Sequence, residues 1–318
     1  MKGRSIGDGE GRLSGPAEGP SVLLGQAYHL RFDPKLWAGQ QPYPPLGSLY
    51  ALSVLREAGF DVRFHDSMLA ESEAEWASAL DRETPRFAVL YEDNFNYLTK
   101  MCLLRMREAA VTMIQAAKQR GCTVIVAGSD ATDHPEPYLD AGADWVIAGE
   151  GDLTLRELLE MLSTGQPVTS VPGLVYRGEA GETVRTIPRP ILRHLDTLPL
   201  PAWDLVDFGR YRALWKTSGV VNATYALNLV TSRGCPYHCN WCAKPIWGQR
   251  YNARSPESVV EEMAWLHEHA GMDYVWFMDD MFGVKPRWTA RFADALEARG
   301  LRIPFKCLNR ADLILRDG

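Results

Sequence analysis

The sequence has no long apolar segment, and its N-terminus lacks the features of a secretory signal. No run approaches the roughly 20 apolar residues of a membrane-spanning helix, and residues 1–20 are rich in glycine, serine and charge. Positive charge is also scarce, since 34 Lys and Arg face 40 Asp and Glu, which disfavours a broad nucleic-acid surface. These absences predict a cytoplasmic protein with a mobile tail over residues 1–20 and with neither nucleic acid nor membrane as its partner.

Cysteine is scarce too, and its distribution excludes a disulfide framework. Three of the six cysteines crowd between positions 235 and 242, whereas Cys102, Cys122 and Cys307 are scattered in apolar surroundings. In a reducing compartment a crowded set indicates metal ligands. We interpret the three scattered cysteines as small buried side chains without chemistry.

The chain of 318 residues is too long for one ordinary core, so we expect two domains. In residues 21–165 fully apolar strands alternate with amphipathic helical stretches, and Gly59, Gly121 and Gly142 stand as helix stops. This pattern predicts an α/β fold with a doubly wound, Rossmann-like parallel sheet covered on both faces. The expected strands are residues 21–26, 60–66, 87–92, 123–128 and 145–150, and the main helices are residues 46–59, 99–121 and 152–162.

The second half of the chain begins with an irregular segment. Residues 166–224 contain prolines at 167, 172, 188, 190, 199 and 201, which predicts a connecting segment with a small hairpin near residues 173–178. From residue 225 the βα alternation resumes, with strands at 227–232, 274–278 and 305–309 and helices at 255–269 and 286–299. This array stops at Gly318 where another helix is expected, so we interpret the sequence as an incomplete reading frame or fragment.

One motif carries the chemistry. The segment TSRGCPYHCNWCAKP places Cys235, Cys239 and Cys242 in a C-x3-C-x2-C array directly after an apolar strand. Three thiolates can hold three irons of a four-iron cluster and leave the fourth iron open to a small molecule. The alternative is a structural zinc site, but that needs four ligands, and His238 inside the loop is the only extra candidate nearby. The number of ligands therefore favours iron and sulfur.

The same array, with Trp241 as the aromatic residue of C-x3-C-x-aromatic-C, resembles the radical S-adenosylmethionine superfamily. The resemblance implies a [4Fe-4S] cluster whose open iron chelates S-adenosylmethionine and whose electron cleaves the sulfonium. It also implies a small-molecule substrate and an electron donor of the flavodoxin or ferredoxin type. The family's partial (β/α)6 TIM-like barrel has six strands, so residues 225–318 would cover about its first half.

The resemblance also assigns cofactor contacts at two further strand ends. In FMDDMFG, Asp279 and Asp280 stand where the family has its second-strand motif near the methionyl amine, although many members have a Gly-Gly-Glu type of sequence there. Which aspartate faces the ligand is open, and an ordinary acidic loop is the alternative. Arg310 in LNRAD resembles the arginine of an R-x-D pattern, with a surface salt bridge as its alternative.

The segments YPPLGSLYALSVLREAGFDV and GADWVIAGEGDLTLRELL resemble the opening and closing parts of the cobalamin-binding domain that precedes many radical S-adenosylmethionine enzymes. No D-x-H-x-x-G is present, and His134 lacks the right spacing, so the resemblance implies cobalamin without a histidine on cobalt. No GxGxxG follows the first strand, which disfavours a nicotinamide cofactor. Doubly wound sheets bind ligands beyond the carboxyl ends of their strands, and the expected contacts are Gly25, Tyr28, Asn94, Tyr97, Gly128, Ser129, Gly149, Glu150 and Gly151. For Gly128, Gly149 and Gly151, a role as simple turn glycines is the alternative.

The leading hypothesis is a cobalamin-dependent radical S-adenosylmethionine enzyme that methylates an unactivated carbon. A second hypothesis keeps the radical chemistry but replaces methyl transfer by cyclisation or rearrangement, as in the anaerobic cyclase of bacteriochlorophyll synthesis. A third is a corrinoid or redox sensor without catalysis.

Overall fold

The computed structural model describes residues 21–95, 103–218, 224–240, 242 and 246–317. These residues form two compact units. The first unit comprises the described parts of Met1–Trp37, Pro45–Pro190 and Pro199–Val206, and the second those of Ala38–Pro44, Ile191–Leu198 and Asp207–Gly318. The segment 166–224, which the sequence presents as a connection, is therefore divided between the two units. The predicted mobile tail, residues 1–20, lies outside the described residues.

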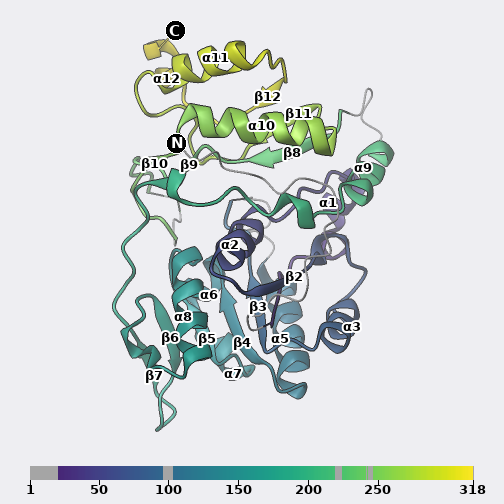
Figure 1. The fold of residues 1–318 in the computed structure, drawn as a ribbon, viewed down its shortest axis with the longest axis vertical. Helices are drawn as coiled ribbons and strands as arrows, with labels where there is room; N and C mark the ends of the chain where they lie inside the picture. The colour runs from purple at the N-terminus through teal and green to yellow at the C-terminus, as the bar shows by residue number, and fades with distance from the viewer. Residues whose placement is uncertain (1–20, 96–102, 219–223, 241, 243–245, 318) are drawn as a thin grey trace. The chain divides into compact units, whose positions relative to one another are not determined.

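The first unit is built around a seven-stranded sheet with the order β2-β1-β3-β4-β5-β6-β7 (Figure 1). Strands β1 to β5 are parallel, as the sequence predicts, while the predicted small hairpin forms β6 and β7 and extends the sheet antiparallel to β5. The strands are β1 (Ser21–Gly25), β2 (Asp61–His65), β3 (Phe87–Tyr91), β4 (Thr123–Ala127), β5 (Trp145–Ile147), β6 (Leu174–Arg177) and β7 (Thr183–Arg185).

Helices cover both faces of this sheet. On one face Leu23, Leu90 and Val126 join Trp76 of α3 and Met113 of α5 in one buried cluster. Alternate strand residues point to the opposite face, where α2 packs on β1, β2 and β3 and also contacts α8. The helices before residue 170 are α1 (Pro34–Gly39), α2 (Leu46–Glu57), α3 (Ala74–Glu83), α5 (Leu103–Gln119), α6 (Ser129–Asp133), α7 (Glu136–Asp140) and α8 (Asp152–Thr164), with short 3-10 helices at Leu30–Phe32, Ser67–Leu69 and Val168–Ser170.

The predicted helix stops are confirmed by their backbone angles. Gly59, Gly121 and Gly142 have φ values of 88°, 75° and 109°. This left-handed region is disfavoured for residues that carry a Cβ atom. Each glycine lies within two residues of the end of its helix, where it directs the chain toward the next strand.

The second unit contains a parallel sheet of three strands in the order β12-β11-β8. Helix α10 follows β8 and helix α11 follows β11, and the two helices contact each other, which matches the predicted βα alternation. The elements of this unit are β8 (Ala226–Leu229), β11 (Tyr274–Phe277), β12 (Phe305–Lys306), α9 (Phe208–Thr217), α10 (Pro256–Ala270), α11 (Trp288–Arg299) and α12 (Ala311–Asp317), with a 3-10 helix at Leu195–Thr197. The 3-10 helix Trp203–Leu205 belongs to the first unit.

Helix α10 begins and ends as its sequence predicts. The Oγ atom of Ser255 accepts a hydrogen bond from the main-chain N–H of Ser258, and Pro256 occupies the first turn. Gly271 ends the helix with a φ of 61°. Among the described residues, no helix has both the length and the apolar character that crossing a bilayer requires.

Candidate functional site

The three clustered cysteines lie on one loop at the carboxyl end of β8. Two short strands, β9 (Ser232–Arg233) and β10 (Asn252–Ala253), pair antiparallel and bring the two ends of this loop together. We call residues 234–251 the cysteine loop. The sequence places the cysteines at a strand end but gives no sign of the β9–β10 pairing, because each strand is only a few residues long.

Within the cysteine loop the thiols differ in exposure. Cys235 is buried, whereas Cys239 and Cys242 are exposed. The main-chain N–H of Cys242 donates to the carbonyl oxygen of Cys239 at 3.1 Å, which forms a tight turn. Trp241, predicted as part of the motif, lies outside the described residues.

The donor set fits an iron–sulfur cluster better than a closed zinc site. Three thiols come from one loop, and His238 is exposed. Within the described ranges, no group of three His, Cys, Asp or Glu side chains is already gathered as a metal site. Gly234 precedes Cys235 with a φ of 78°, and an added Cβ atom would lie 2.1 Å from the carbonyl oxygen of Arg250. Only glycine therefore lets the start of the loop pass so close to its end.

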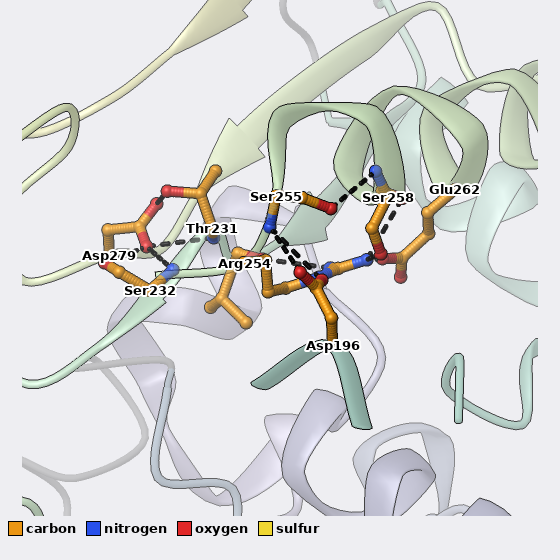
Figure 2. A network of polar contacts seen from close by, with 9 residues as sticks. Asp196, Thr231, Ser232, Arg254, Ser255, Ser258, Glu262 and Asp279 are labelled. Atoms are coloured by element: carbon orange, nitrogen blue, oxygen red, sulfur yellow. Dashed lines mark hydrogen bonds and ion pairs between the residues drawn. The ribbon is translucent and has the colours of Figure 1, made fainter. Parts of the chain in front are cut away.

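Asp279, one of the two predicted second-strand acids, is buried and forms hydrogen bonds within the second unit. It is 2% exposed. Its carboxyl group accepts hydrogen bonds from the N–H and hydroxyl of Thr231 at 2.9 and 3.1 Å, and from the N–H and hydroxyl of Ser232, both at 2.6 Å (Figure 2). Burial raises the pKa of Asp279 to about 7, although these hydrogen bonds act in the opposite direction.

Asp280, the neighbouring acid, has a different environment. It is exposed, and it makes no hydrogen bond or ion pair within the described part of the chain. Successive residues at a strand end point in different directions. Of the two aspartates that the sequence leaves open, Asp280 is therefore the one whose carboxylate is available to a ligand.

The far end of the cysteine loop is anchored by a buried ion pair. Arg254 and Glu262 are 5% and 0% exposed at their side chains, and Arg254 also donates to the carbonyl oxygen of Val230 and to Ser258 (Figure 2). The indole N–H of Trp288 donates to the carbonyl oxygen of Arg254 at 2.7 Å. Arg254, the residue after β10, is thus bonded to the end of β8, to α10 and to α11.

A residue from the proline-rich segment takes part in this arrangement. The carboxylate of Asp196 accepts from the main-chain N–H of Ser255 at 2.9 Å, at the start of α10 (Figure 2). A negative charge is favourable there because the N-terminal N–H groups of a helix carry partial positive charge. The sequence gives no signal for this contact, since the two residues are 59 positions apart.

Arg310 is the third predicted cofactor contact on this unit. It is exposed, and it forms a surface salt bridge, which the sequence predicts as the alternative to a cofactor contact. Its Nε atom lies 2.9 Å from Asp312. Its guanidinium also lies 4.2 Å from the ring centroid of Tyr237, a residue of the cysteine loop. The structure thus brings Arg310 to the cysteine loop through a cation–π contact.

In the first unit the strand order reverses at β1, which has β2 on one side and β3 on the other. Doubly wound sheets bind ligands beyond the carboxyl ends of the strands at such a point. The main-chain N–H of Ala27, after β1, donates to Oε1 of Glu92, after β3, at 2.6 Å. Glu92 is half-buried, and burial of its carboxyl group, together with repulsion from Asp93 and Asp130, raises its pKa to about 7.

Glu92 is absent from the residues that the sequence selects. The available signal is its place directly after the fully apolar strand β3, at the reversal of the strand order. Gln26, after β1, is another such residue, because its fully buried amide has no hydrogen-bond partner among the described residues. A buried amide without a partner is costly, so this strand end fits a ligand that offers polar groups.

Two of the predicted contacts on the first unit meet. The hydroxyl of Ser129 donates to Oδ1 of Asn94 at 2.9 Å, which joins the ends of β4 and β3. Tyr28 does not take part, because it is 1% exposed and its hydroxyl donates to Asp33 at 3.2 Å. Tyr97 lies outside the described residues. Glu150 is buried.

The glycines predicted to admit a cofactor are mostly explained by packing within the unit. An added Cβ atom would lie 3.0 Å from the Trp76 ring at Gly25, 2.7 Å from Glu92 at Gly128, and 2.7 Å from the Tyr91 hydroxyl at Gly151. Gly149 differs, since no atom lies within 4 Å of that position and its φ is 91°. Gly149 is therefore the member of this set with open space beside it.

Residues 39–159 match the family described as the B12 binding domain. The chain carries a B12-binding domain. The loops after β3, β4 and β5 described above lie within the matched range, whereas β1 precedes it.

Curated relatives align with most of the chain. The uncharacterized methyltransferase PH0819 of Pyrococcus horikoshii is 29% identical over 276 residues, which cover 85% of this chain and 56% of the relative. The anaerobic magnesium-protoporphyrin IX monomethyl ester cyclase of Synechocystis is 25% identical over 282 residues, which cover 87% and 53%. This chain spans about half of the length of these relatives.

A solved structure shows the same fold. The cobalamin-dependent S-adenosylmethionine radical enzyme OxsB, with aqua-cobalamin and S-adenosylmethionine bound, matches 93% of this chain and 39% of its own, with a TM-score of 0.73 and 21% identity. The B12-binding domain followed by a partial parallel barrel, as predicted, is therefore confirmed as the fold class. The predicted resemblance to radical S-adenosylmethionine enzymes with a B12-binding domain is confirmed as well. The cobalamin-dependent radical SAM methyltransferase TokK of Streptomyces tokunonensis is 26% identical over 261 residues, which cover 73% of this chain and 35% of the relative.

Proposed function

We propose that this chain forms the cofactor-binding part of a cobalamin-dependent radical S-adenosylmethionine enzyme that methylates an unactivated carbon of a small molecule. The observation that carries the proposal is the cysteine loop. It presents three cysteine side chains at the carboxyl end of the first strand of a parallel βα array, and this array follows a B12-binding domain.

The residues of the second unit have distinct tasks in this proposal. Cys235, Cys239 and Cys242 hold three irons of a [4Fe-4S] cluster, which leaves one iron for S-adenosylmethionine. The free carboxylate of Asp280 receives the methionyl ammonium in a charge-assisted contact. When bound, the cluster supplies the electron that cleaves S-adenosylmethionine, and cobalamin carries the methyl group.

The B12-binding domain supplies the second cofactor site. We propose that cobalamin binds beyond the carboxyl ends of β1, β3 and β5. Gln26, Glu92 and Asn94 offer polar groups there, and Gly149 after β5 offers open space. These residues would orient the cofactor by hydrogen bonds, and no histidine of the expected motif is present to bind cobalt.

The proposal includes the partners and the location. A flavodoxin- or ferredoxin-type protein would deliver the electron. Thiols that serve as iron ligands need a reducing compartment, so we propose that the protein works in the cytoplasm.

Cyclisation without methyl transfer is a second candidate, since one relative is named as a cyclase. The test is an anaerobic reaction of the protein, supplied with cobalamin and a reductant, with S-adenosylmethionine. Formation of 5′-deoxyadenosine supports the enzyme class, and S-adenosylhomocysteine formed beside it supports methylation over cyclisation. If neither product forms in protein that holds its cluster, catalysis is contradicted and the sensor alternative gains support.

A further inference from the structure

The feature of interest is the pair of residues that leads into the cysteine loop. Thr231 and Ser232 follow β8, and Ser232 begins β9. Their two main-chain N–H groups and two hydroxyls all donate to Asp279, which follows β11 (Figure 2). One buried carboxyl group therefore satisfies four donors at the point where the chain leaves the sheet.

The same point is held from the opposite side. The carbonyl oxygen of Thr231 accepts from the main-chain N–H of Arg254 at 2.8 Å, and Arg254 follows β10. Arg254 is itself fixed by its buried ion pair with Glu262 on α10. Thr231 is thus bonded on one side to Asp279 and on the other to the residue at which the loop returns.

Only Arg233 and Gly234 separate this anchored pair from Cys235. Cys235 is also the buried thiol of the three. Because the intervening chain is short and paired with β10, the position of Ser232 restricts the position of the Cys235 backbone. When one end of a loop is already fixed, the chain also loses less conformational entropy as the three cysteines come together around a cluster.

We infer that Asp279 is a positioning residue that holds the entry of the cysteine loop and thereby Cys235, and that it is not a contact of S-adenosylmethionine. This inference rests on the proposed function for the identity of the cluster. The neighbouring Asp280 is exposed and makes no hydrogen bond or ion pair within the described residues. It therefore serves as the control, because it is an aspartate in the same loop that does not hold the cysteine loop.

The test compares Asp279→Ala, Asp279→Asn and Asp280→Ala in the full chain loaded anaerobically with iron and sulfide. Two quantities are measured: the rate at which a chelator removes iron, and the affinity for S-adenosylmethionine from its effect on the resonance of the reduced cluster. We expect Asp279→Ala to speed iron removal by about tenfold, since several buried hydrogen bonds are lost. Its loaded fraction should keep the parent's affinity for S-adenosylmethionine, and Asp280→Ala should show the reverse pattern.

The Asp279→Asn variant separates a hydrogen-bonding role from a charge role. Its amide oxygen still accepts from the two main-chain N–H groups, and its NH2 group can donate to a hydroxyl. We therefore expect Asp279→Asn to restore slow iron removal. If Asp279→Ala and Asp279→Asn both weaken S-adenosylmethionine binding while iron removal is unchanged, Asp279 is a cofactor contact and the inference is overturned.

Two further variants cover the case in which Asp279→Ala does not fold. Thr231→Val and Ser232→Ala each remove one hydroxyl donor and keep the main-chain N–H. Each should speed iron removal in the same direction by a smaller factor. Unchanged removal in both variants contradicts the inference.

A parent protein that binds no iron overturns the proposed function. The positioning role of Asp279 is then tested on the cysteine thiols of the protein without a cluster. The rate of alkylation of Cys235 is compared between parent and Asp279→Ala, with the buried Cys122 of the first unit as internal control. Faster alkylation of Cys235 alone supports the positioning role. Equal rates in the two proteins overturn it.

Discussion

The main-chain N–H of Ala27 donates to Oε1 of Glu92 at 2.6 Å, and this bond joins the ends of β1 and β3, where the strand order reverses. The bond uses one carboxyl oxygen of a half-buried side chain whose pKa is raised to about 7. Glu92 therefore combines three properties of a ligand-site residue: its position at the switch point, its partial burial and its perturbed pKa.

The raised pKa of Glu92 predicts a pH-dependent stability. The folded protein keeps the proton of Glu92 up to about pH 7, whereas the unfolded chain releases it near the ordinary value of 4.5. The folded state thus binds more protons between these values, so the free energy of unfolding should fall as pH rises from about 4.5 to 7. Glu92→Gln should reduce this slope, which for one group is at most about 1.4 kcal/mol per pH unit. Urea unfolding at several pH values measures it, and an identical slope in parent and variant contradicts the prediction.

The cysteine loop predicts a cluster of about four irons and four sulfides in anaerobically prepared protein. Cys235→Ala, Cys239→Ala and Cys242→Ala should each abolish it, because each removes one of three ligands. Cys122→Ala and Cys307→Ala are the matched controls and should keep the iron content of the parent. Iron and sulfide analysis with absorbance spectroscopy checks this. Stoichiometric zinc without charge-transfer absorption in an iron-replete preparation would falsify the cluster assignment.

The exposed carboxylate of Asp280 predicts a defect in cofactor binding alone. Asp280→Asn should weaken S-adenosylmethionine binding by roughly tenfold or more, since a charge-assisted contact contributes about 1.5–3 kcal/mol. Its iron content should equal that of the parent. Asp294→Asn, in α11, is the control for a general change of charge. If the parent and Asp280→Asn bind S-adenosylmethionine with equal affinity, Asp280 is not the residue of the second-strand motif that contacts the cofactor.

The two ion pairs of α10 should differ sharply in their effect on stability. Glu262→Ala leaves Arg254 buried without its partner, which should lower the free energy of unfolding by about 3–5 kcal/mol. Glu257→Ala breaks an ion pair with Arg291 whose side chains are both 58% exposed, so it should change stability by less than about 1 kcal/mol. Denaturant unfolding of both variants checks the contrast, and similar losses from the two substitutions contradict it.

Cobalamin bound to the full chain should carry no protein histidine on cobalt. The expected D-x-H-x-x-G motif is missing, and His134 stands at the end of α6. Electron paramagnetic resonance of the cob(II)alamin form should therefore lack a nitrogen splitting from the protein. A splitting that disappears in His134→Ala contradicts this expectation, and a chain that binds no cobalamin contradicts the proposed cofactor itself.

Local patterns in the sequence determined much of the fold. The apolar strands β1 to β5, the helices α2, α8 and α10 and the glycines that end helices all follow from periodicity and capping, which act over a few residues. The three-cysteine motif is equally local, since its spacing alone selects the three candidate ligands. These features are therefore visible without knowledge of the folded chain.

The tertiary structure alone decided how the polar residues are used. Asp279 and Asp280 are equivalent in the sequence, but Asp279 bonds to Thr231, which is 48 positions away, while Asp280 stays exposed. The contact of Asp196 with Ser255 and that of Glu92 with Ala27 span 59 and 65 positions. Hydrogen bonds at such separations depend on strand order and on the meeting of distant strand ends, and no periodicity along the chain encodes them.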